Sequence, residues 1–239
     1  MTIKKTITAT EGTFDGKLAL EAVLTIAQDA LTYYFGTIGV DNASMRKKFN
    51  SVWVVAKNKA TIYYRPFWNE TVKISCSFIN VGKITCYCLT EMRSSSDKLL
   101  FSVLSELCVV HLEDFRLMPI DSLSLPIEEN VKISKSDFVF TKPDDYNTEK
   151  NVTVSPLLTD FSNHMNNAKL LFPVVDNLSK ETLSKIYEGV FDIIVHYKKQ
   201  AMSGEKTTFY LSEKDGDVFF EYRLSEGSTA SFGRITKRI

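Results

Sequence analysis

The sequence predicts an α+β protein built from two similar halves, each with a helix followed by a run of antiparallel strands. Two observations support this: the helix-then-strands order occurs twice, and a proline-containing segment without periodicity separates the two occurrences. The chain has 239 residues, and two domains of about 120 residues each would lie within the usual domain size. Hydrophobic residues make up 44% and charged residues 24%, so the chain can bury a sizeable core without disulfides.

The first half begins with a helix over residues 18–35, which are apolar on most sides and therefore predict a buried helix. Asp15 is the expected N-cap, and Gly36 or Gly39 the expected end. Segments rich in β-branched and aromatic residues then alternate with turn residues and predict a meander of strands. The expected strands are residues 52–64, 71–79, 83–92 and 99–112.

The second half repeats this order after residues 118–145, which carry Pro119, Pro126 and Pro143 and are interpreted as a linker. The helices expected there are residues 164–177, which contain Pro173, and a shorter one from Ser179 to residue 186. The expected strands are residues 151–156, 187–201, 206–211, 218–224 and 228–236, with a hairpin turn at residues 214–216.

The two halves can be overlaid. Phe14 and Phe161 lie 147 positions apart (161 − 14), and Leu24 and Leu171 keep the same offset. Together with the repeated element order, these identities indicate a duplication. A long buried helix wrapped by an antiparallel sheet is the hotdog arrangement, so we expect an α+β double hotdog. Its parts would be residues 1–118, a linker over 119–145, and residues 146–239.

Composition excludes several function classes. The 29 basic and 29 acidic residues balance, which argues against a nucleic-acid or anionic-membrane partner. No segment has signal-peptide character or approaches the ~18 apolar residues of a membrane span, so a cytoplasmic protein is expected. No metal-ligand spacing, phosphate loop or dinucleotide fingerprint occurs, and we expect no metal and no cofactor. Buried reduced thiols are the expected state of Cys76, Cys86, Cys88 and Cys108.

The densest polar cluster, residues 159–167, lies where a strand is expected to end and a helix to begin. Asp, Ser and Asn are preferred helix caps, so capping alone is one interpretation. The other is catalysis, because free N–H groups at a helix start stabilise an oxyanion and a nearby carboxylate or imidazole activates water. Asp160 and His164 are the candidates for the second role.

The cluster resembles a known motif. Acyl-acyl-carrier-protein (acyl-ACP) thioesterases carry Asp-x-Asn-x-His-Val-Asn-Asn at the helix start of their second hotdog, and this chain reads Asp160-Phe-Ser-Asn-His-Met-Asn-Asn167. The resemblance covers nearly the whole chain. Its other segments are Phe14-Asp-Gly16, Trp53-Val-Val55, Tyr64-Arg-Pro-Phe-Trp68, Asn69-Glu-Thr-Val-Lys-Ile74 and Val195-His-Tyr-Lys-Lys-Gln200.

This resemblance implies hydrolysis of fatty-acyl thioesters by residues 146–239, with residues 1–118 shaping the acyl pocket. The implied catalytic residues are Asp160, Ser162, His164 and Gln200. The implied substrate-binding residues are Asn163, Asn166 and Asn167. Two catalytic positions depart from the family, which has an asparagine where this chain has Ser162 and a glutamate where it has Gln200. An amide can orient water but cannot accept its proton.

The implied substrate is an acyl chain on acyl carrier protein or coenzyme A. Lys198 with Lys199, or the basic residues 46–48, are candidate contacts for an acidic carrier, although solvated surface charge is the simpler interpretation. A monomer acting as its own pseudo-dimer and a homodimer are both compatible with duplication. His111 and His196 are interpreted as structural. Two alternatives remain, an acyl-binding protein without hydrolysis and a hotdog hydratase or dehydratase.

Overall fold

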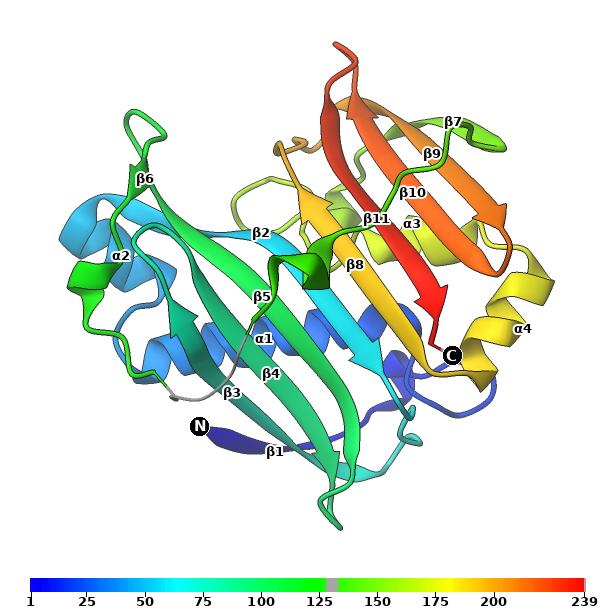
Figure 1. Cartoon of the computed structure of the whole chain (residues 1–239), viewed down its shortest axis with the longest axis horizontal. Coiled ribbons are helices and arrows are strands. Elements are labelled where there is room, and N and C mark those ends of the chain that lie inside the picture. The colour runs from blue at the N-terminus through cyan, green and yellow to red at the C-terminus, as the bar shows by residue number, and fades with distance from the viewer. Residues whose placement is uncertain (128–132, 239) are drawn as a thin grey trace.

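Strands dominate the fold and form one eleven-stranded sheet (Figure 1). The computed structural model describes residues 1–127 and 133–238. The strands of the first half are β1 (Thr2–Thr6), β2 (Ser51–Ile62), β3 (Thr71–Val81), β4 (Cys86–Ser94), β5 (Leu99–His111) and β6 (Leu117–Met118). Those of the second half are β7 (Thr148–Thr153), β8 (Phe191–Tyr197), β9 (Lys206–Lys214), β10 (Asp217–Leu224) and β11 (Thr229–Lys237). The α-helices are α1 (Leu20–Thr37), α2 (Asn42–Phe49), α3 (Leu171–Asp176) and α4 (Lys180–Glu188).

The strand order is symmetric about the central pair formed by β2 and β8. The path runs β1-β3-β4-β5-β2-β8-β11-β10-β9-β7, so each half repeats the same order outward from the centre. The two central strands pair antiparallel from Lys57 opposite His196 to Ile62 opposite Phe191. Both halves therefore share one continuous sheet, as the sequence-based expectation of a double hotdog requires.

Helix α1 lies along the face of the sheet that is turned away from the viewer in Figure 1. Ten of its residues are buried on several sides, which accounts for the nearly all-round apolar pattern. The expected N-cap was wrong, because the helix begins after Ala19 and Asp15 belongs to the preceding turn. The helix ends at Thr37, with Gly39 just beyond it at φ +69°.

The second-half helix is much shorter than residues 164–177. His164 and Met165 form isolated antiparallel bridges with Met202 and Thr159, which hold that backbone extended. Helix α3 begins only at Leu171, so Pro173 falls in its first turn, where the missing N–H has no intrahelical partner to lose. Helix α4 begins as expected, with the Ser179 side chain accepting a hydrogen bond from the Thr182 N–H.

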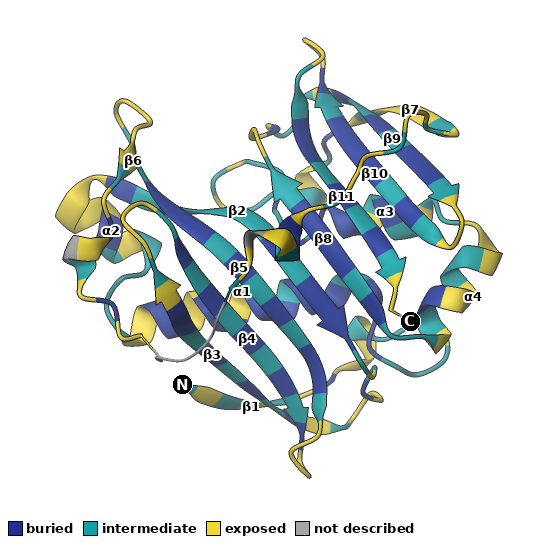
Figure 2. Ribbon diagram, viewed as in Figure 1, coloured by how far each residue is buried: buried dark blue, intermediate teal, exposed yellow. Residues whose placement is uncertain are grey.

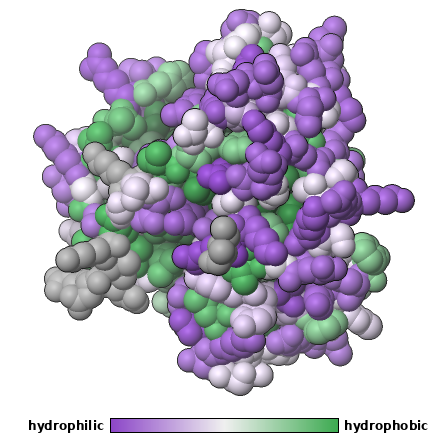
Figure 3. All heavy atoms as spheres, turned by 45° about the vertical axis from the view of Figure 1, so that its right-hand side comes forward, coloured by the Kyte–Doolittle hydropathy of each residue, from purple (hydrophilic) through white to green (hydrophobic). Residues whose placement is uncertain are grey.

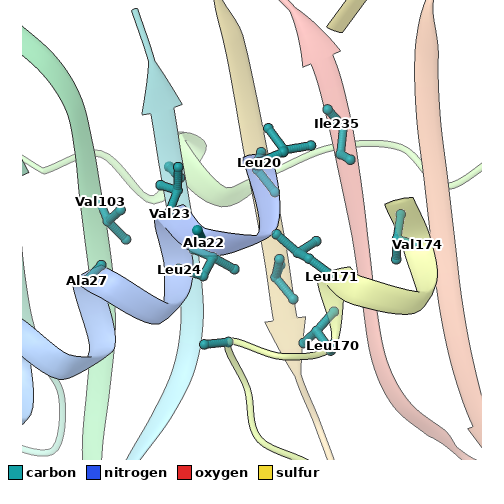
Figure 4. Packing of buried hydrophobic residues seen from close by; sticks show 14 of the residues in the cluster. Leu20, Ala22, Val23, Leu24, Ala27, Val103, Leu170, Leu171, Val174 and Ile235 are labelled. Carbon is teal, nitrogen blue, oxygen red and sulfur yellow. The ribbon is translucent and has the colours of Figure 1, made fainter. Parts of the chain in front are cut away.

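The main core forms where helices α1 and α3 pack against the sheet. Buried and half-buried residues alternate along the strands, because one strand face packs against the helices (Figure 2). In Figure 4, Leu20 and Leu24 of α1 lie close to Leu170 and Leu171 of the second half, all four of them buried. A second cluster surrounds the C-terminal part of α1 and includes the buried Phe78. All four cysteines are buried free thiols, as expected.

The connection between the halves crosses the opposite face of the sheet, in front of β2 and β8 in Figure 1. Its 3-10 turn η3 (Lys135–Phe138) buries Phe138 to 1% exposure. Asp137 forms an ion pair with Lys59 of β2 at 2.9 Å, and His196 of β8 contacts the Phe138 carbonyl at 2.7 Å. The connection is thereby fixed to both central strands, at the junction of the halves.

Candidate active site

A tight turn brings Asp160, Ser162 and His164 into one loop. The Asp160 N–H donates to the His164 carbonyl at 3.0 Å, and the Asn163 N–H donates to the Asp160 carbonyl at 3.0 Å. Asn163 closes the turn in the left-handed region, at φ 62°, which Asn tolerates better than most residues. The backbone of the expected motif is therefore ordered before the helix begins.

A second segment of the chain lies against this loop and carries Gln200. The Met165 N–H donates to the Ala201 carbonyl at 2.7 Å, and the Ser203 N–H donates to the Asn163 carbonyl at 3.0 Å. These two bonds fix the residue after Gln200 beside the loop. The structure thus brings the four expected catalytic positions to adjoining segments.

Several side chains of the loop have no hydrogen-bond partner among the residues that the structure describes. One oxygen of Asp160 accepts the Ser162 N–H at 2.8 Å. Within residues 1–127 and 133–238, no hydrogen bond engages the Ser162 hydroxyl, the His164 ring or the exposed Gln200 amide. The backbone N–H groups of His164 and Asn167 are likewise unpaired within those residues. These donors and acceptors are available to a ligand.

The three expected substrate-binding asparagines differ in their environment. Asn166 is buried, and its side-chain oxygen accepts the Ala168 N–H at 2.8 Å, so it caps the turn that leads into α3. Asn163 is exposed on the turn. The carbonyl of Asn167 accepts a hydrogen bond from the Tyr197 hydroxyl at 3.0 Å.

The first half contains the same turn with different side chains. The Thr13 N–H donates to the Lys17 carbonyl, and the Gly16 N–H donates to the Thr13 carbonyl. Each of these residues precedes its second-half counterpart by 147 positions (160 − 13), and Gly16, at φ 74°, corresponds to Asn163. The adjoining segment follows the same rule, because the Leu18 N–H donates to the Pro66 carbonyl as Met165 does to Ala201. Arg65 therefore occupies the position equivalent to Gln200.

The polar groups of the first-half turn are committed to one another. Arg65 is 5% exposed and binds both oxygens of Asp15, at 2.8 and 3.0 Å. Asp15 also accepts the Lys17 N–H at 3.0 Å, whereas the equivalent N–H of His164 is unpaired within the described ranges. Burial alone would raise the pKa of Asp15, but the bonds from Thr13, Arg65 and Lys17 and the Arg65 charge lower it to about 2. The Arg65–Asp15 ion pair thus occupies the polar side chains of the first-half turn, whereas Gln200 and Ser162 at the equivalent positions of the second half form no ion pair.

Comparison with known proteins decides the family. The sequence model of the acyl-ACP thioesterase N-terminal domain matches residues 3–122, half of the 239 residues. The chain belongs to the acyl-ACP thioesterase family. As a thioesterase it is a hydrolase of fatty-acyl thioesters. Comparison with curated protein sequences found no match.

Solved structures agree on the fold. An acyl-ACP thioesterase from Bacteroides thetaiotaomicron is 12% identical, with a TM-score of 0.86 over 100% of this chain and 97% of that chain. The 12:0-ACP thioesterase from Umbellularia californica is 15% identical, with a TM-score of 0.83 over 100% of this chain and 96% of that one. These likenesses confirm the α+β double hotdog.

The other polar candidates of the thioesterase have structural surroundings. His196 packs against Phe232, with ring centroids 4.7 Å apart, and its ring nitrogen contacts the connection. His111 lies 3.6 Å from Asp114 at the end of β5. Lys17, the counterpart of His164, lies over the Phe67 ring at 5.3 Å. These contacts agree with the structural interpretation of the two histidines.

The surroundings of the site carry both charge and exposed apolar groups. Figure 3 shows one face of the whole molecule, on which polar side chains alternate with patches of apolar ones. Leu157 precedes the site loop and Phe161 lies within it, and their side chains are 83% and 86% exposed. Lys198 and Lys199 lie close to Gln200 in the chain, and Lys199 is exposed. Within the described ranges, no helix is long and apolar enough to cross a membrane, and no group of His, Cys, Asp or Glu is arranged to hold a metal ion.

Sequence reasoning missed the groups that support the site from other strands. Asn58 of β2 donates to the Tyr197 hydroxyl at 3.2 Å, across 139 residues of sequence. Arg65 and Tyr197 both lie in segments that resemble the family, but neither segment indicates what its residue contacts. The available signal was Asn58 itself, a polar residue among the apolar residues on the inward face of its strand.

Proposed function

We propose that the chain releases free fatty acids from acyl carrier protein at the second-half loop, with Asp160, Ser162, His164 and Gln200 as its working groups. The observation that carries this proposal is the difference between the two equivalent loops. In the first, Arg65 and Asp15 occupy each other. In the second, the equivalent Gln200 and Ser162 leave their polar groups open to a substrate and water.

The reaction is a hydrolysis without a covalent enzyme intermediate. Water, oriented by Gln200 and by the second oxygen of Asp160, attacks the thioester carbonyl, and its proton passes to Asp160. The oxyanion is stabilised by the unpaired N–H groups of His164 and Asn167. The carbon–sulfur bond then breaks, the thiolate takes up the proton, and a carboxylic acid and a thiol leave. His164 and Ser162 hold the reacting groups by hydrogen bonds.

The oxyanion donors in this proposal differ from those expected at a helix N-terminus. The Ala168 N–H is bonded to the Asn166 side chain at 2.8 Å. The N–H groups of His164 and Asn167 precede this capped turn and are unpaired within the described residues, so we assign them as the oxyanion donors. Asn163, beside them, is proposed to contact the substrate, while Asn166 supports the site as a cap.

The carrier is proposed to dock where Lys198 and Lys199 lie beside the exposed Leu157 and Phe161. An acidic carrier protein would be attracted by the lysines and would cover the apolar side chains. The acyl chain would extend toward the first half, residues 1–118. Acyl carrier protein holds fatty acids during their synthesis, so we place the reaction in fatty acid biosynthesis in the cytoplasm, with one chain serving as its own pseudo-dimer.

The decisive experiment compares equivalent positions of the two halves. Release of fatty acid from acyl-ACP is measured for wild type, Asp160→Ala, His164→Ala and the matched first-half control Lys17→Ala. We expect kcat/KM to fall about 100-fold for the first two variants and to stay at the wild-type value for the control. Equal rates for wild type and Asp160→Ala would overturn the assigned role of Asp160.

A second experiment tests the carrier. Lys198→Glu/Lys199→Glu is compared with Lys47→Glu/Lys48→Glu, which places the same charge change on α2. The same acyl group is supplied on acyl carrier protein or on coenzyme A. The variant Lys198→Glu/Lys199→Glu should raise KM for acyl-ACP about tenfold, and the α2 variant should not. A KM that changes equally for both pairs would place the carrier elsewhere.

A second candidate function is acyl binding without hydrolysis. Ser162 and Gln200 favour this function, because Ser162 replaces the amide of the family's catalytic asparagine and Gln200 replaces the carboxylate of its glutamate. Tight binding of an acyl thioester with no release of fatty acid over hours would support this function and exclude the first.

A further inference from the structure

A chain of buried and partly buried hydrogen bonds leads from the first-half sheet into the candidate active site. The Ser105 hydroxyl of β5 donates to the Asn58 side-chain oxygen at 2.7 Å. The Asn58 amide donates to the Tyr197 hydroxyl at 3.2 Å, and that hydroxyl donates to the Asn167 carbonyl at 3.0 Å. Every bond in this chain runs in the same direction, toward the site loop.

The chain of bonds lies in the protein interior, where each member depends on the next. Ser105 is 6% and Asn58 8% exposed. Along β2 and β5 they separate the two apolar clusters, with Ala60 and Val103 on one side and Trp53 and Leu107 on the other. Leaving a buried polar group unpaired costs about 1–3 kcal/mol. Aligned hydrogen bonds also polarise one another, so the last bond, to Asn167, is strengthened by the first two.

This feature exists at one of the two equivalent sites only. Because Ala201 corresponds to Pro66, the offset on this strand is 135 positions (201 − 66), and Tyr197 corresponds to Ile62. Asn58 corresponds to Ile193 by the same offset, and Ile193 pairs with Ile235 as Asn58 pairs with Ser105. Three aliphatic side chains thus replace the three polar ones in the half whose loop is closed by Arg65.

The bonds act on Asn167 from both sides. The Asn166 N–H is bonded to the Leu158 carbonyl at 2.8 Å, and the Asn166 side chain caps Ala168. The Tyr197 hydroxyl holds the Asn167 carbonyl. Both neighbouring peptide units are therefore fixed, and the Asn167 N–H is presented in one orientation.

We propose that Tyr197 is a positioning residue of this thioesterase: oriented by Asn58 and Ser105, it holds the Asn167 carbonyl and so fixes the adjoining peptide unit, whose Asn167 N–H meets the developing oxyanion. The inference rests on the proposed function of the second-half loop. It also makes the first half a contributor to catalysis, because two of the three side chains belong to β2 and β5. The acyl-pocket half and the catalytic half would then be coupled through hydrogen bonds.

The test removes the hydroxyl and keeps the ring. Tyr197→Phe should lower kcat about tenfold and leave KM within about twofold, because a transition-state contact is misplaced while ground-state binding is kept. The matched control is Tyr222→Phe: its hydroxyl also donates to a carbonyl of the same turn, that of Leu170 at 3.0 Å. The control should lower the melting temperature to a similar extent and leave kcat unchanged.

A double-mutant cycle tests whether the bonds act as one unit. Asn58→Leu should lower kcat in the wild-type background and have little further effect on Tyr197→Phe. Ser105→Ala, which removes a single hydroxyl from the far end of the chain of bonds, gives the same test if Tyr197→Phe folds poorly. A kcat of Tyr197→Phe within about twofold of wild type, an equal loss in Tyr222→Phe, or additive losses would overturn the proposal. Failure of the proposed function would show separately, as no hydrolysis by wild type.

Discussion

Arg65 donates two hydrogen bonds to Asp15, of 2.8 and 3.0 Å, and the equivalent residues of the second half are Gln200 and Ser162. The backbone of the two turns is the same, so the difference lies in the side chains alone. Duplication supplied two equivalent loops. The first-half loop contains an internal ion pair. In the second-half loop the Ser162 hydroxyl and the Gln200 amide have no hydrogen-bond partner within the described residues, and we propose that they serve the reaction.

Removal of the Arg65 charge should destabilise the protein. Arg65→Gln leaves Asp15 without its cation in a partly buried position, and we expect the free energy of unfolding to fall by about 3 kcal/mol. Urea denaturation measures this fall. In an NMR titration the pKa of Asp15, about 2 in the wild type, should rise.

Arg65→Lys is the matched variant, because it keeps the charge and loses the planar fork. It should lie between wild type and Arg65→Gln in stability. If both variants were as stable as wild type, the ion pair would be a surface contact of no structural value.

Restoring the family's carboxylate in place of the Gln200 amide should increase activity. Gln200→Glu places a group that can accept a proton beside the site loop, and we expect kcat to rise about tenfold at neutral pH. The acid side of the pH profile of kcat should change from that of wild type, because a second carboxyl group would then have to be ionised to accept the proton of the water. Steady-state rates from about pH 4 to 8 measure both effects.

Gln28→Glu is the control for added charge, since Gln28 lies on α1 among its partly exposed residues. It should leave kcat and the pH profile as in the wild type. An unchanged profile for Gln200→Glu would mean that the side chain of Gln200 does not face the reacting water.

The architecture could be predicted because the repeated order of elements and the alternation along each strand can be recognised from neighbouring residues in the sequence. Alternating buried residues, as in β4, identify a strand without reference to its partners. The length of α3 could not be predicted in this way. Residues 164–170 are kept out of the helix by bridges to Thr159 and Met202, and those contacts depend on tertiary structure.

The candidate site shows the same division. Its motif around Asp160 was recognised from residue types and spacing within one turn. The commitment of Asn166 to capping, the bond from Tyr197 to Asn167 and the role of Arg65 depend on segments that only folding brings together. Sequence reasoning therefore identified the groups that we propose to face the substrate, and it missed the contacts between segments that are distant in the sequence.

Acid should weaken the packing of the connection on the second half. Glu221 of β10 is 1% exposed and binds Arg223 and Thr229, together with Lys142 and Tyr146 of the connection. All of these residues except Thr229 border a hollow of about 340 Å³. Burial alone would raise the pKa of Glu221, but the hydrogen bonds and the Lys142 charge lower it from 4.5 to about 2.

The sign of the effect follows from the lowered pKa. The unfolded chain takes up a proton near the ordinary pKa of 4.5, and the folded protein only near 2. The stabilisation is complete above pH 4.5 and is lost as the pH falls toward 2, on the order of 3 kcal/mol in total. Urea midpoints measured across this range should fall steeply for wild type and less steeply for Glu221→Gln. Equal slopes would contradict the assignment.

Gly233 of β11 lets two strands and a core ring approach closely. A Cβ atom there would lie 2.3 Å from the Phe220 ring and 2.5 Å from the Ile194 carbonyl. The carbonyl belongs to the neighbouring central strand and cannot turn away, so Gly233→Ala should cost about 3 kcal/mol of unfolding free energy. Thermal or urea unfolding measures this loss.

Gly36→Ala is the control that separates the steric cost at Gly233 from any general effect of replacing glycine by alanine. Gly36 lies in α1, and a Cβ atom there meets nothing within 4 Å. Alanine in a helix is favoured over glycine by roughly 0.5–1 kcal/mol, so this variant should be slightly more stable than wild type. Phe220→Leu should recover only part of the loss in Gly233→Ala, because it removes the contact with the ring and leaves the contact with the Ile194 carbonyl. Full recovery would assign the whole cost to the ring.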